Sequence, residues 1–246
     1  MADRVLLVTG ASSDIGLATI RAILASPDAP TVLAHSFRGG EKIQALQAEF
    51  GERVRSVEAD FTDAASVRKM ADDILAQYGA PHSVLHLPAL RLNYERFTKF
   101  DWQRFESDLS VQVQAAVILL QRFLPKMAKM QDSRVVFVLS SVTHGMPPKF
   151  LSMYTMLKYT QLGLMRALAA EYAATSVRIN GISPSMVQTQ FLGEIAEVAV
   201  EMSAAASPQG RNAVPQDLVG AIQFLLSPAA GYITGADLPI SAGSVC

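Results

Sequence analysis

Two kinds of hydrophobic pattern alternate along the 246 residues of the chain. Short runs of Val, Leu and Ile without polar alternation predict strands that are buried on both faces. Longer stretches with apolar residues three or four positions apart predict amphipathic helices. The predicted strands are residues 5–9, 31–35, 54–59, 84–87, 135–139, 177–182 and 238–240. The predicted helices are residues 15–24, 41–50, 64–78, 102–130, 152–174 and 217–226.

This alternation predicts an α/β fold with one doubly wound parallel sheet of about seven strands and helices on both faces. The sequence has no internal repeat, charge run or Pro/Gly-rich linker, so residues 1–246 are expected to form a single domain. Ligands of open α/β sheets bind beyond the carboxyl ends of the strands. The loops that follow the strands are therefore the places to look for chemistry.

Composition narrows the class of protein further. Half of the residues are hydrophobic and 17% are charged, which excludes a disordered chain. The net charge of −1 gives no broad basic surface for nucleic acid. The single cysteine, Cys246, cannot form an intrachain disulfide, and the histidines are too scattered to suggest a metal site. The longest uniformly apolar run, residues 115–120, is far below the roughly 18 residues of a membrane span. With no leader segment visible, we expect a cytoplasmic protein without a membrane partner.

A loop rich in small residues, Thr-Gly-Ala-Ser-Ser-Asp-Ile-Gly at 9–16, follows the first predicted strand. Free N–H groups at the start of the next helix can hold a pyrophosphate. Two glycines alone are weak evidence, because any strand-to-helix turn can contain them. Asp14 is a good helix N-cap, but its charge lies close to the expected phosphate. The candidate cofactor-binding residues here are Gly10, Ser12, Ser13, Asp14, Ile15 and Gly16.

The second predicted strand is followed by a basic residue rather than an acidic one. Ser36 and Arg38 stand where an enzyme that prefers NAD places a carboxylate for the ribose 2′-hydroxyl, and no acid occurs before Glu41. An arginine suits the 2′-phosphate of NADP. We therefore expect NADPH to be preferred, the alternative being that Arg38 is simply an exposed loop residue.

A phenol and an ammonium lie one helical turn apart at Tyr154 and Lys158. A nearby cation lowers the pKa of a phenol toward the range of a general acid. Ser141 closes the strand at 135–139 and precedes Tyr154 by thirteen residues. We expect the three side chains to converge on a substrate carbonyl, although serines after strands are commonly turn or cap residues.

Together these motifs resemble the short-chain dehydrogenase/reductase family over nearly the whole chain. The residues that carry the resemblance are the 9–16 loop, Asp60, the Ser141/Tyr154/Lys158 set, residues 180–184 with Thr189, and Tyr-Ile-Thr-Gly at 232–235. The resemblance implies a Rossmann-type fold in which Tyr154 protonates the carbonyl oxygen as hydride leaves the nicotinamide. It also implies that Lys158 holds the nicotinamide ribose and lowers the pKa of Tyr154, and that Ser141 binds the carbonyl. The further cofactor contacts that it implies are Asp60, Phe61, Pro88, Ala89, Ile182, Pro184, Val187 and Thr189.

Within the family the chain looks most like the 3-oxoacyl-[acyl-carrier-protein] reductase branch, through its length and the Pro-Gln-Gly-Arg segment at 208–211. This implies an NADPH-dependent ketoreductase whose substrate is apolar or thioester-linked, free or bound to a carrier protein. It further implies a substrate lid at about 190–212 and a homo-oligomer, either a tetramer or a dimer. The broad apolar faces of helices 102–130 and 152–174 would be buried in such an oligomer.

Four departures from the family pattern lie on the cofactor side. Asp14 replaces a usual glycine, Leu-Pro-Ala-Leu at 87–90 replaces Asn-Asn-Ala-Gly, and Ser185 replaces a common glycine. Gln112 stands in the place of the active-site asparagine and is the fourth candidate catalytic residue. Its extra methylene is expected to displace a relay water near Lys158 or to hold it differently, while Leu90 is expected to narrow the pocket. The rival hypothesis is a pseudo-reductase, a binding or assembly partner with weak or absent cofactor binding.

Overall fold

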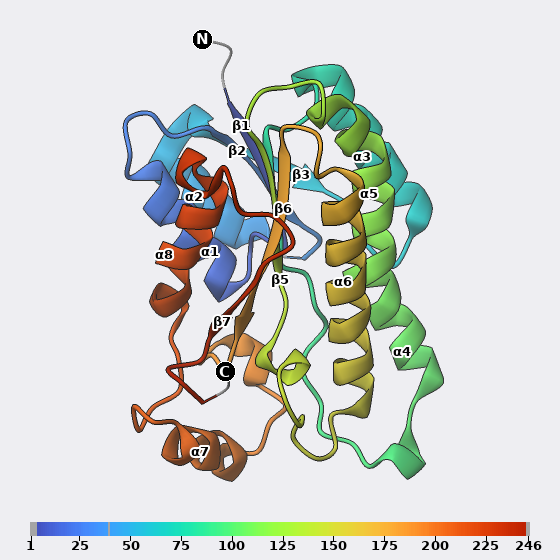
Figure 1. Cartoon of the computed structure of the whole chain (residues 1–246), viewed down its shortest axis with the longest axis vertical. Helices are drawn as coiled ribbons and strands as arrows, with labels where there is room; N and C mark the ends of the chain where they lie inside the picture. Colours follow the sequence, from blue (N-terminus) through green and yellow to red (C-terminus); the bar gives the residue numbers. More distant parts are fainter. Residues whose placement is uncertain (1–3, 39, 245–246) are drawn as a thin grey trace.

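Seven parallel strands form one sheet in the order β3-β2-β1-β4-β5-β6-β7. The structure is a computed structural model that describes residues 4–38 and 40–244 (Figure 1). The strands are β1 (Val5–Thr9), β2 (Thr31–Ser36), β3 (Val54–Glu58), β4 (Ser83–His86), β5 (Ser133–Val138), β6 (Val177–Pro184) and β7 (Asp237–Ile240). Each strand begins and ends within two residues of its prediction, and the predicted single-domain α/β fold is confirmed.

Helices cover both faces of the sheet. The α-helices are α1 (Asp14–Leu24), α2 (Gly40–Phe50), α3 (Ala64–Tyr78), α4 (Trp102–Leu109), α5 (Ala115–Met127), α6 (Ser152–Glu171), α7 (Glu197–Ala206) and α8 (Pro215–Leu226). Short 3₁₀ turns are η1 (Gly51–Arg53), η2 (Phe97–Lys99), η4 (Ser141–Thr143), η5 (Gln190–Leu192) and η6 (Pro228–Ala230). Figure 1 shows α1, α2 and α8 on one side of the sheet, α3 to α6 on the other, and α7 beyond the carboxyl ends of the strands.

The helices differ from the prediction in two places. The expected helix 102–130 is divided into α4 and α5 by a π-helical turn, η3 (Ser110–Gln114), which takes up an extra residue in the helical path. Helix α7 was not predicted as a helix. Its sequence, Glu-Val-Ala-Val-Glu-Met-Ser-Ala-Ala-Ala, is apolar on most of its faces, so no single apolar stripe marks it as an amphipathic helix.

The central strands β1, β4 and β5 are buried along their whole length because they contribute to two cores. In β1, Val5 and Leu7 belong to the core under α3, α5 and α6, whereas Leu6 and Val8 belong to the core under α1, α2 and α8. Successive side chains of a strand point to opposite faces. A strand without polar positions is therefore what this two-sided burial requires.

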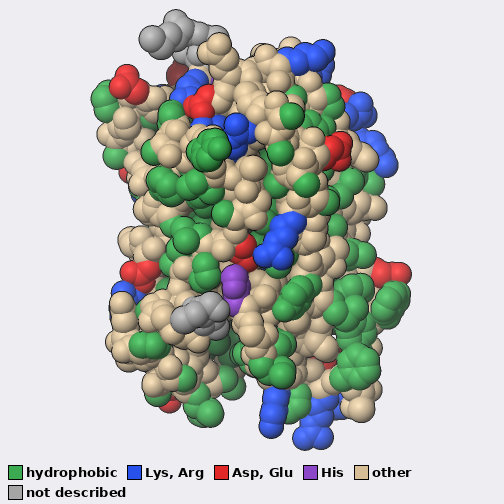
Figure 2. Space-filling view, viewed as in Figure 1, with side chains coloured by type: hydrophobic (Ala, Val, Ile, Leu, Met, Phe, Trp, Pro, Cys, Tyr) green, Lys and Arg blue, Asp and Glu red, His purple; other side chains and the backbone are tan. Residues whose placement is uncertain are grey.

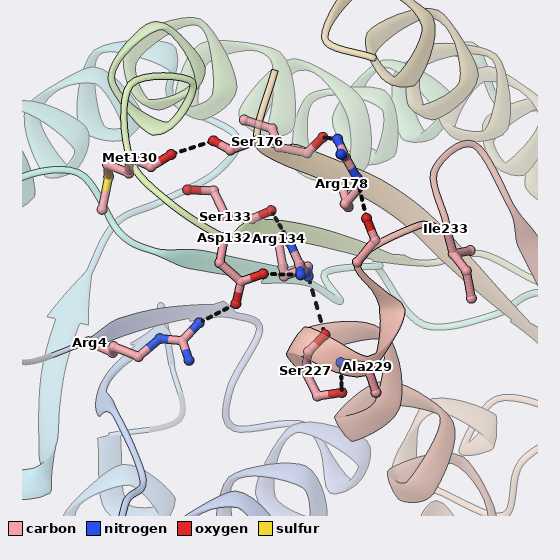
Figure 3. A network of polar contacts seen from close by, with 12 residues as sticks. Arg4, Met130, Asp132, Ser133, Arg134, Ser176, Arg178, Ser227, Ala229 and Ile233 are labelled. Carbon is pink, nitrogen blue, oxygen red and sulfur yellow. Dashed lines mark hydrogen bonds and ion pairs between the residues drawn. The ribbon is translucent and has the colours of Figure 1, made fainter. Parts of the chain in front are cut away.

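A buried arginine fastens the amino-terminal end of the sheet, as Figure 3 shows. Arg134 of β5 is 2% exposed and pairs with Asp132, which also accepts a hydrogen bond from Arg4 at 3.1 Å. The Arg134 Nε group donates to the Ser227 carbonyl before η6 at 3.3 Å. This network lies at the opposite end of the strands from the loops of interest, so it serves the stability of the fold.

The surface of the chain shows no feature that points to a particular kind of partner in the described residues. On the face seen in Figure 2, basic and acidic side chains are interspersed among hydrophobic and uncharged ones. Within residues 4–38 and 40–244, no helix is long and apolar enough to cross a membrane. The same residues contain no group of three or more His, Cys, Asp or Glu side chains that could hold a metal ion. Cys246, on which the disulfide prediction rests, lies outside the described residues.

Candidate active site

A cleft of about 1200 Å³ lies at the carboxyl ends of the strands. Its walls are the loops that follow β1 to β6, together with η5 and part of α7. The strand order reverses between β1 and β4, which are neighbours in the sheet but not in sequence. The cleft thus lies at the topological switch point, where this class of sheet binds ligands.

Most of the predicted site residues line this cleft. They are Gly10, Ser12, Ser13, Asp14, Ile15, Ser36, Arg38, Asp60, Phe61, Pro88, Ala89, Ser141, Tyr154, Lys158, Pro184, Val187 and Thr189. Gly16, Gln112 and Ile182 do not line it. Ile182 is a fully buried member of the core under α8, so the expectation that it frames the nicotinamide amide is not supported.

Gly16 shapes the loop rather than the cleft wall. A Cβ atom added at Gly16 would lie 2.7 Å from the Ala11 carbonyl oxygen, so only a glycine allows α1 to approach the loop this closely. The Ser13 hydroxyl accepts a hydrogen bond from the Gly16 amide at 3.1 Å and caps the helix. Gly10 has a φ of +71°, which also favours glycine. The two glycines together produce a sharp turn that ends in a helix amino terminus.

Asp14 is the first residue of α1 and is not its N-cap, contrary to the expectation. Its carboxylate accepts a hydrogen bond from the Gln190 amide at 2.7 Å, which ties the loop to the start of the predicted lid. Lys42 of α2 lies 3.8 Å from the same carboxylate and donates to the Gln190 side chain at 3.1 Å. Lys42 lines the cleft and was not among the predicted residues. Its ammonium offsets part of the charge that Asp14 brings to this corner.

Arg38, just after β2, is a second cation of the cleft besides Lys42. The Arg38 guanidinium lies over the Phe37 ring, 5.1 Å from its centroid. Arg38 and Lys42 both line the cleft. Guanidinium and ammonium groups at this position offer donors for a phosphate on the adenosine ribose.

A buried histidine holds three of the cleft loops together. His35 accepts a hydrogen bond from the Gly10 amide at its Nδ1 atom (3.2 Å) and donates from Nε2 to the Ala59 carbonyl (3.1 Å). Its ring stacks on Phe61 at 4.0 Å. Burial lowers the pKa of His35 to about 4, so the ring is neutral at pH 7. The prediction missed this residue because its role depends on contacts with distant loops.

Tyr154 and Lys158 lie on the first two turns of α6 and face the cleft. The Lys158 ammonium lies 5.6 Å from the centroid of the Tyr154 ring and donates to the Val138 carbonyl at 3.1 Å. Burial raises the pKa of Tyr154 to about 12, in spite of a hydrogen bond with Ser140. Burial also lowers the pKa of Lys158 to about 8. The expected lowering of the phenol pKa is therefore not found, because burial outweighs the other contributions.

Two neighbouring serines at the end of β5, Ser140 and Ser141, are candidates for the serine that acts beside Tyr154. Ser140, rather than Ser141, forms the hydrogen bond with the Tyr154 hydroxyl. Ser141 begins η4 and also lines the cleft, so its predicted contact with a substrate carbonyl stays a prediction. Ser140 is the residue that spacing alone did not single out.

Gln112 is connected to the site by its main-chain carbonyl, not by its side chain. The residue is fully buried in the π-helical turn, and its carbonyl accepts hydrogen bonds from His86 at 2.9 Å and Gln161 at 3.0 Å. Its side-chain amide donates to Asp108 at 2.8 Å, while its Oε1 atom has no partner among the described residues. Burial raises the pKa of Asp108. The position predicted for a catalytic amide is thus a buried junction behind the cleft.

The mouth of the cleft beside Tyr154 is apolar. Leu92, Val142 and Leu151 form a small cluster against which Tyr94, Tyr154, Phe191, Leu192 and Ile195 pack. The Phe191 ring of η5 lies 6.2 Å from the Tyr154 ring. Leu90 also lines the cleft and packs against the core under α3 and α5, so its expected narrowing of the pocket stays a prediction. Residues from the predicted lid therefore form the wall that faces the tyrosine.

His144 is an additional polar group on this wall. It lines the cleft, and its Nε2 atom lies 2.9 Å from the Asp237 carboxylate. Asp237 also accepts a hydrogen bond from the Ser183 hydroxyl at 2.7 Å. This arrangement fixes the imidazole between the loop after β5 and the start of β7.

Comparisons with known proteins agree with this arrangement. The family model described as enoyl-(acyl carrier protein) reductase matches residues 10–244. A cis-4-hydroxycyclohexanecarboxylate dehydrogenase of Sinomonas cyclohexanicum is 29% identical over 98% of this chain and 96% of its own length. The 3-oxoacyl-[acyl-carrier-protein] reductase of Thermotoga maritima is 25% identical over 98% of each chain. A solved 3-ketoacyl-(acyl-carrier-protein) reductase from Brucella melitensis, complexed with NADH, has a TM-score of 0.87 at 23% identity and covers 99% of each chain.

The match extends over both halves of the site. It begins at Gly10 in the first loop, includes the Tyr154 and Lys158 pair, and continues to residue 244 beyond the last strand. The relatives act on chemically different substrates according to their names, so the match identifies a reaction class and a fold. The chain is a member of the short-chain dehydrogenase/reductase family of oxidoreductases.

Proposed function

We propose that the chain is an NADPH-dependent ketoreductase that transfers a hydride to the carbonyl of an apolar or thioester-linked, 3-oxoacyl-like substrate. The observation that carries the proposal is the distribution of groups along one cleft. A protonated phenol and an ammonium, Tyr154 and Lys158, lie near its apolar wall, and two further cations, Arg38 and Lys42, line it after β2.

The residues present fit a phosphorylated dinucleotide. Gly10 and Gly16 allow a tight turn into the amino terminus of α1, which favours a pyrophosphate. Arg38 and Lys42 would hold a 2′-phosphate, and Asp60, Val187 and Thr189 line the intervening wall. The charge of Asp14 opposes phosphate binding, but its oxygens already contact Gln190 and Lys42.

Acid catalysis is the chemistry that the protein itself would supply. When bound, a reduced nicotinamide supplies a hydride to the carbonyl carbon. The Tyr154 hydroxyl donates its proton to the carbonyl oxygen, which becomes the hydroxyl of the product alcohol. With a pKa of about 12 the phenol is fully protonated at pH 7, so it is ready to act as an acid. Lys158 stabilises the phenolate that remains, and a proton from solvent then restores the phenol.

The substrate preference is inferred from the apolar wall. Phe191 and Leu192 of η5 pack beside Tyr154, and Met202 of α7 lines the same side of the cleft. These side chains suit an acyl chain or ring better than a small polar substrate. The name of the Thermotoga relative supports an acyl thioester, delivered free or on a carrier protein.

Tyr154→Phe tests the reaction, with Tyr159→Phe as the matched control on the same helix. Tyr159 is 46% exposed and does not line the cleft, so its loss should leave turnover unchanged. Loss of the acid should lower kcat for 3-oxoacyl thioesters and simple ketones by about 10²–10⁴-fold with NADPH binding retained. Equal turnover of both variants would refute the assignment.

Calorimetric titration with NADPH and NADH tests the cofactor and the second candidate function. The charge of Asp14 at the phosphate corner favours that candidate, a binding or assembly partner that keeps the fold with weak or absent cofactor binding. Micromolar NADPH binding with much weaker NADH binding supports the reductase. No heat from either dinucleotide at millimolar concentration would refute the reductase and favour the binding or assembly partner.

Assembly into a dimer or tetramer is part of the proposal. Met156 and Tyr159 on α6 are large apolar side chains that remain exposed, at 44% and 46%, in the single chain. Burial of such a face between copies would remove apolar surface from water. Sedimentation of the purified protein checks this, since a 26.5 kDa species at micromolar concentration would refute it.

A further inference from the structure

One polar side chain behind the cleft is buried without being part of its wall. Gln161 lies on α6, three residues after Lys158, and is 1% exposed. Its Oε1 atom accepts a hydrogen bond from the Lys158 ammonium at 2.9 Å, and its Nε2 group donates to the Gln112 carbonyl at 3.0 Å. The amide thereby joins α6 to the π-helical turn η3.

The orientation of this amide follows from its partners. An ammonium can only donate and a main-chain carbonyl can only accept, so the amide oxygen must face Lys158 and the amide nitrogen must face Gln112. The reversed amide would place its NH2 group against the Lys158 ammonium and its oxygen against the Gln112 carbonyl. Donor would then face donor and acceptor would face acceptor in a buried site, which is strongly unfavourable. The bridge therefore has one stable arrangement.

Protein groups saturate the Gln112 end of the bridge and leave one donor at the Lys158 end. A carbonyl oxygen has two lone pairs, and the Gln112 carbonyl already accepts from His86 and Gln161. The Lys158 ammonium has three N–H donors, of which two bind Val138 and Gln161. One donor is left, and Lys158 lines the cleft.

The charges that face Lys158 come from several elements. Asp108 of α4 favours the ammonium, but it is not within ion-pair distance among the described residues, and burial raises its own pKa. His86 of β4 is neutral, because burial lowers its pKa to about 4. Tyr154 on α6 keeps its proton. Neutral acceptors, the Val138 carbonyl and the Gln161 amide, are thus the groups in direct contact with the ammonium.

We propose that Gln161 is a positioning residue for Lys158, which holds the ammonium charged and directs its one remaining N–H donor into the cleft. Without the bridge, the buried ammonium loses one of its two acceptors and is easier to deprotonate. The role of the free donor toward a substrate or cofactor rests on the proposed function. The effect of Gln161 on the charge of Lys158 does not.

The test uses two substitutions with opposite expected effects. Gln161→Met keeps the size and linear shape of the side chain but accepts no strong hydrogen bond. Gln161→Glu keeps an acceptor beside Lys158 and adds a negative charge. Gln121→Met, on the exposed surface of α5, makes the same chemical change away from the bridge.

Protonation of Lys158 is read by NMR on protein with isotope-labelled lysine. The chain has seven lysines, and the Lys158 signal is the one missing from Lys158→Met. Relative to the wild type, whose midpoint is expected near pH 8, Gln161→Met should titrate about one pH unit lower and Gln161→Glu higher. Gln121→Met should not differ from the wild type. If Gln161→Met does not fold, Gln161→Leu makes the same test, because it also removes the acceptor of the Lys158 hydrogen bond.

Turnover supplies an independent measurement. The alkaline limb of the kcat profile should move in the same order as the NMR midpoints, with little change in the KM of the carbonyl substrate. Unchanged Lys158 midpoints in both Gln161 variants, with only a loss of stability, would overturn the proposal. Shifted midpoints in a protein that reduces no carbonyl would uphold the role of Gln161 and refute the reductase.

Discussion

Gly16→Ala adds one methyl group at a place where the backbone of the first loop leaves no room. The new Cβ atom would lie 2.7 Å from the Ala11 carbonyl oxygen and 3.0 Å from the Ala11 Cα and carbonyl carbon. These are main-chain atoms, which cannot rotate away. Ala11 is fully buried, and its amide donates to the His35 carbonyl at 2.8 Å. Relief of the contact must therefore move α1 away from the loop or the loop away from β2.

The expected magnitude is the difference of two effects. Alanine is better than glycine in a helix interior by about 1 kcal/mol, and by less in the first turn. Forcing a methyl group into a packed site costs about 1–3 kcal/mol. We expect Gly16→Ala to lower the free energy of unfolding by about 1–2 kcal/mol, and the melting temperature by roughly 2–8 °C for a chain of this length. Because the displaced atoms belong to the candidate phosphate loop, NADPH affinity should fall at least tenfold.

Gly163→Ala is the matched control. Gly163 is an exposed residue in the middle of α6, and an added Cβ would meet no atom of the described chain within 4 Å. This variant should gain about 0.5–1 kcal/mol of stability with unchanged NADPH affinity. Urea unfolding and fluorescence titration with NADPH measure both quantities. A Gly16→Ala protein as stable as Gly163→Ala, with wild-type affinity, would refute the steric argument.

Three further predictions concern charges and buried polar groups. Lys42→Met should weaken NADPH about tenfold and leave NADH unchanged in calorimetry, and equal weakening of both would show that Lys42 does not read the 2′-phosphate. Arg134→Met should lower the free energy of urea unfolding by about 2–3 kcal/mol, since the donors to one buried and two partly buried acceptors are lost, while kcat stays at the wild-type value. His35 and His86, whose pKa values fall from 6.5 to about 4, are neutral in the fold, so the unfolded chain binds more protons below pH 6.5. Stability is therefore full above pH 6.5 and lost as the pH falls toward 4, by roughly 2 kcal/mol for each histidine between pH 7 and 5. His86→Asn should flatten the pH dependence measured by urea unfolding, and an unchanged slope would contradict this assignment.

The fold was predictable because the central strands contain short apolar runs that alternate with helical patterns along the chain. The π-helical turn was not, because Ser110–Gln114 contains neither glycine nor proline to mark the irregularity. Helix α7 was missed for a different reason. Its apolar residues are spread around the helix and show no helical period, although its position beyond the strands makes it part of the cleft wall.

The site was predictable as far as its loops. Motifs placed after strands come together because parallel strands end at one edge of the sheet. The choice between Ser140 and Ser141 could not be made by spacing, since neighbouring residues of an extended segment point in opposite directions. Lys42 and Gln161 were also missed. Their partners Gln190 and Gln112 lie 148 and 49 residues away in the sequence, so no local pattern marks them.

The departure at Gln112 is better understood as part of a coupled set of buried contacts than as a separate defect. Gln112 turns its longer side chain toward Asp108 and supplies that buried carboxylate with a donor at 2.8 Å. Its carbonyl is then occupied by His86 and Gln161, and Gln161 in turn holds Lys158. Asparagine at position 112 would be one methylene too short to keep the contact with Asp108 in the same backbone. Reversion of this single residue toward the family pattern would therefore leave a buried carboxylate short of a donor. This is the kind of change that costs stability even when each residue taken alone looks more familiar.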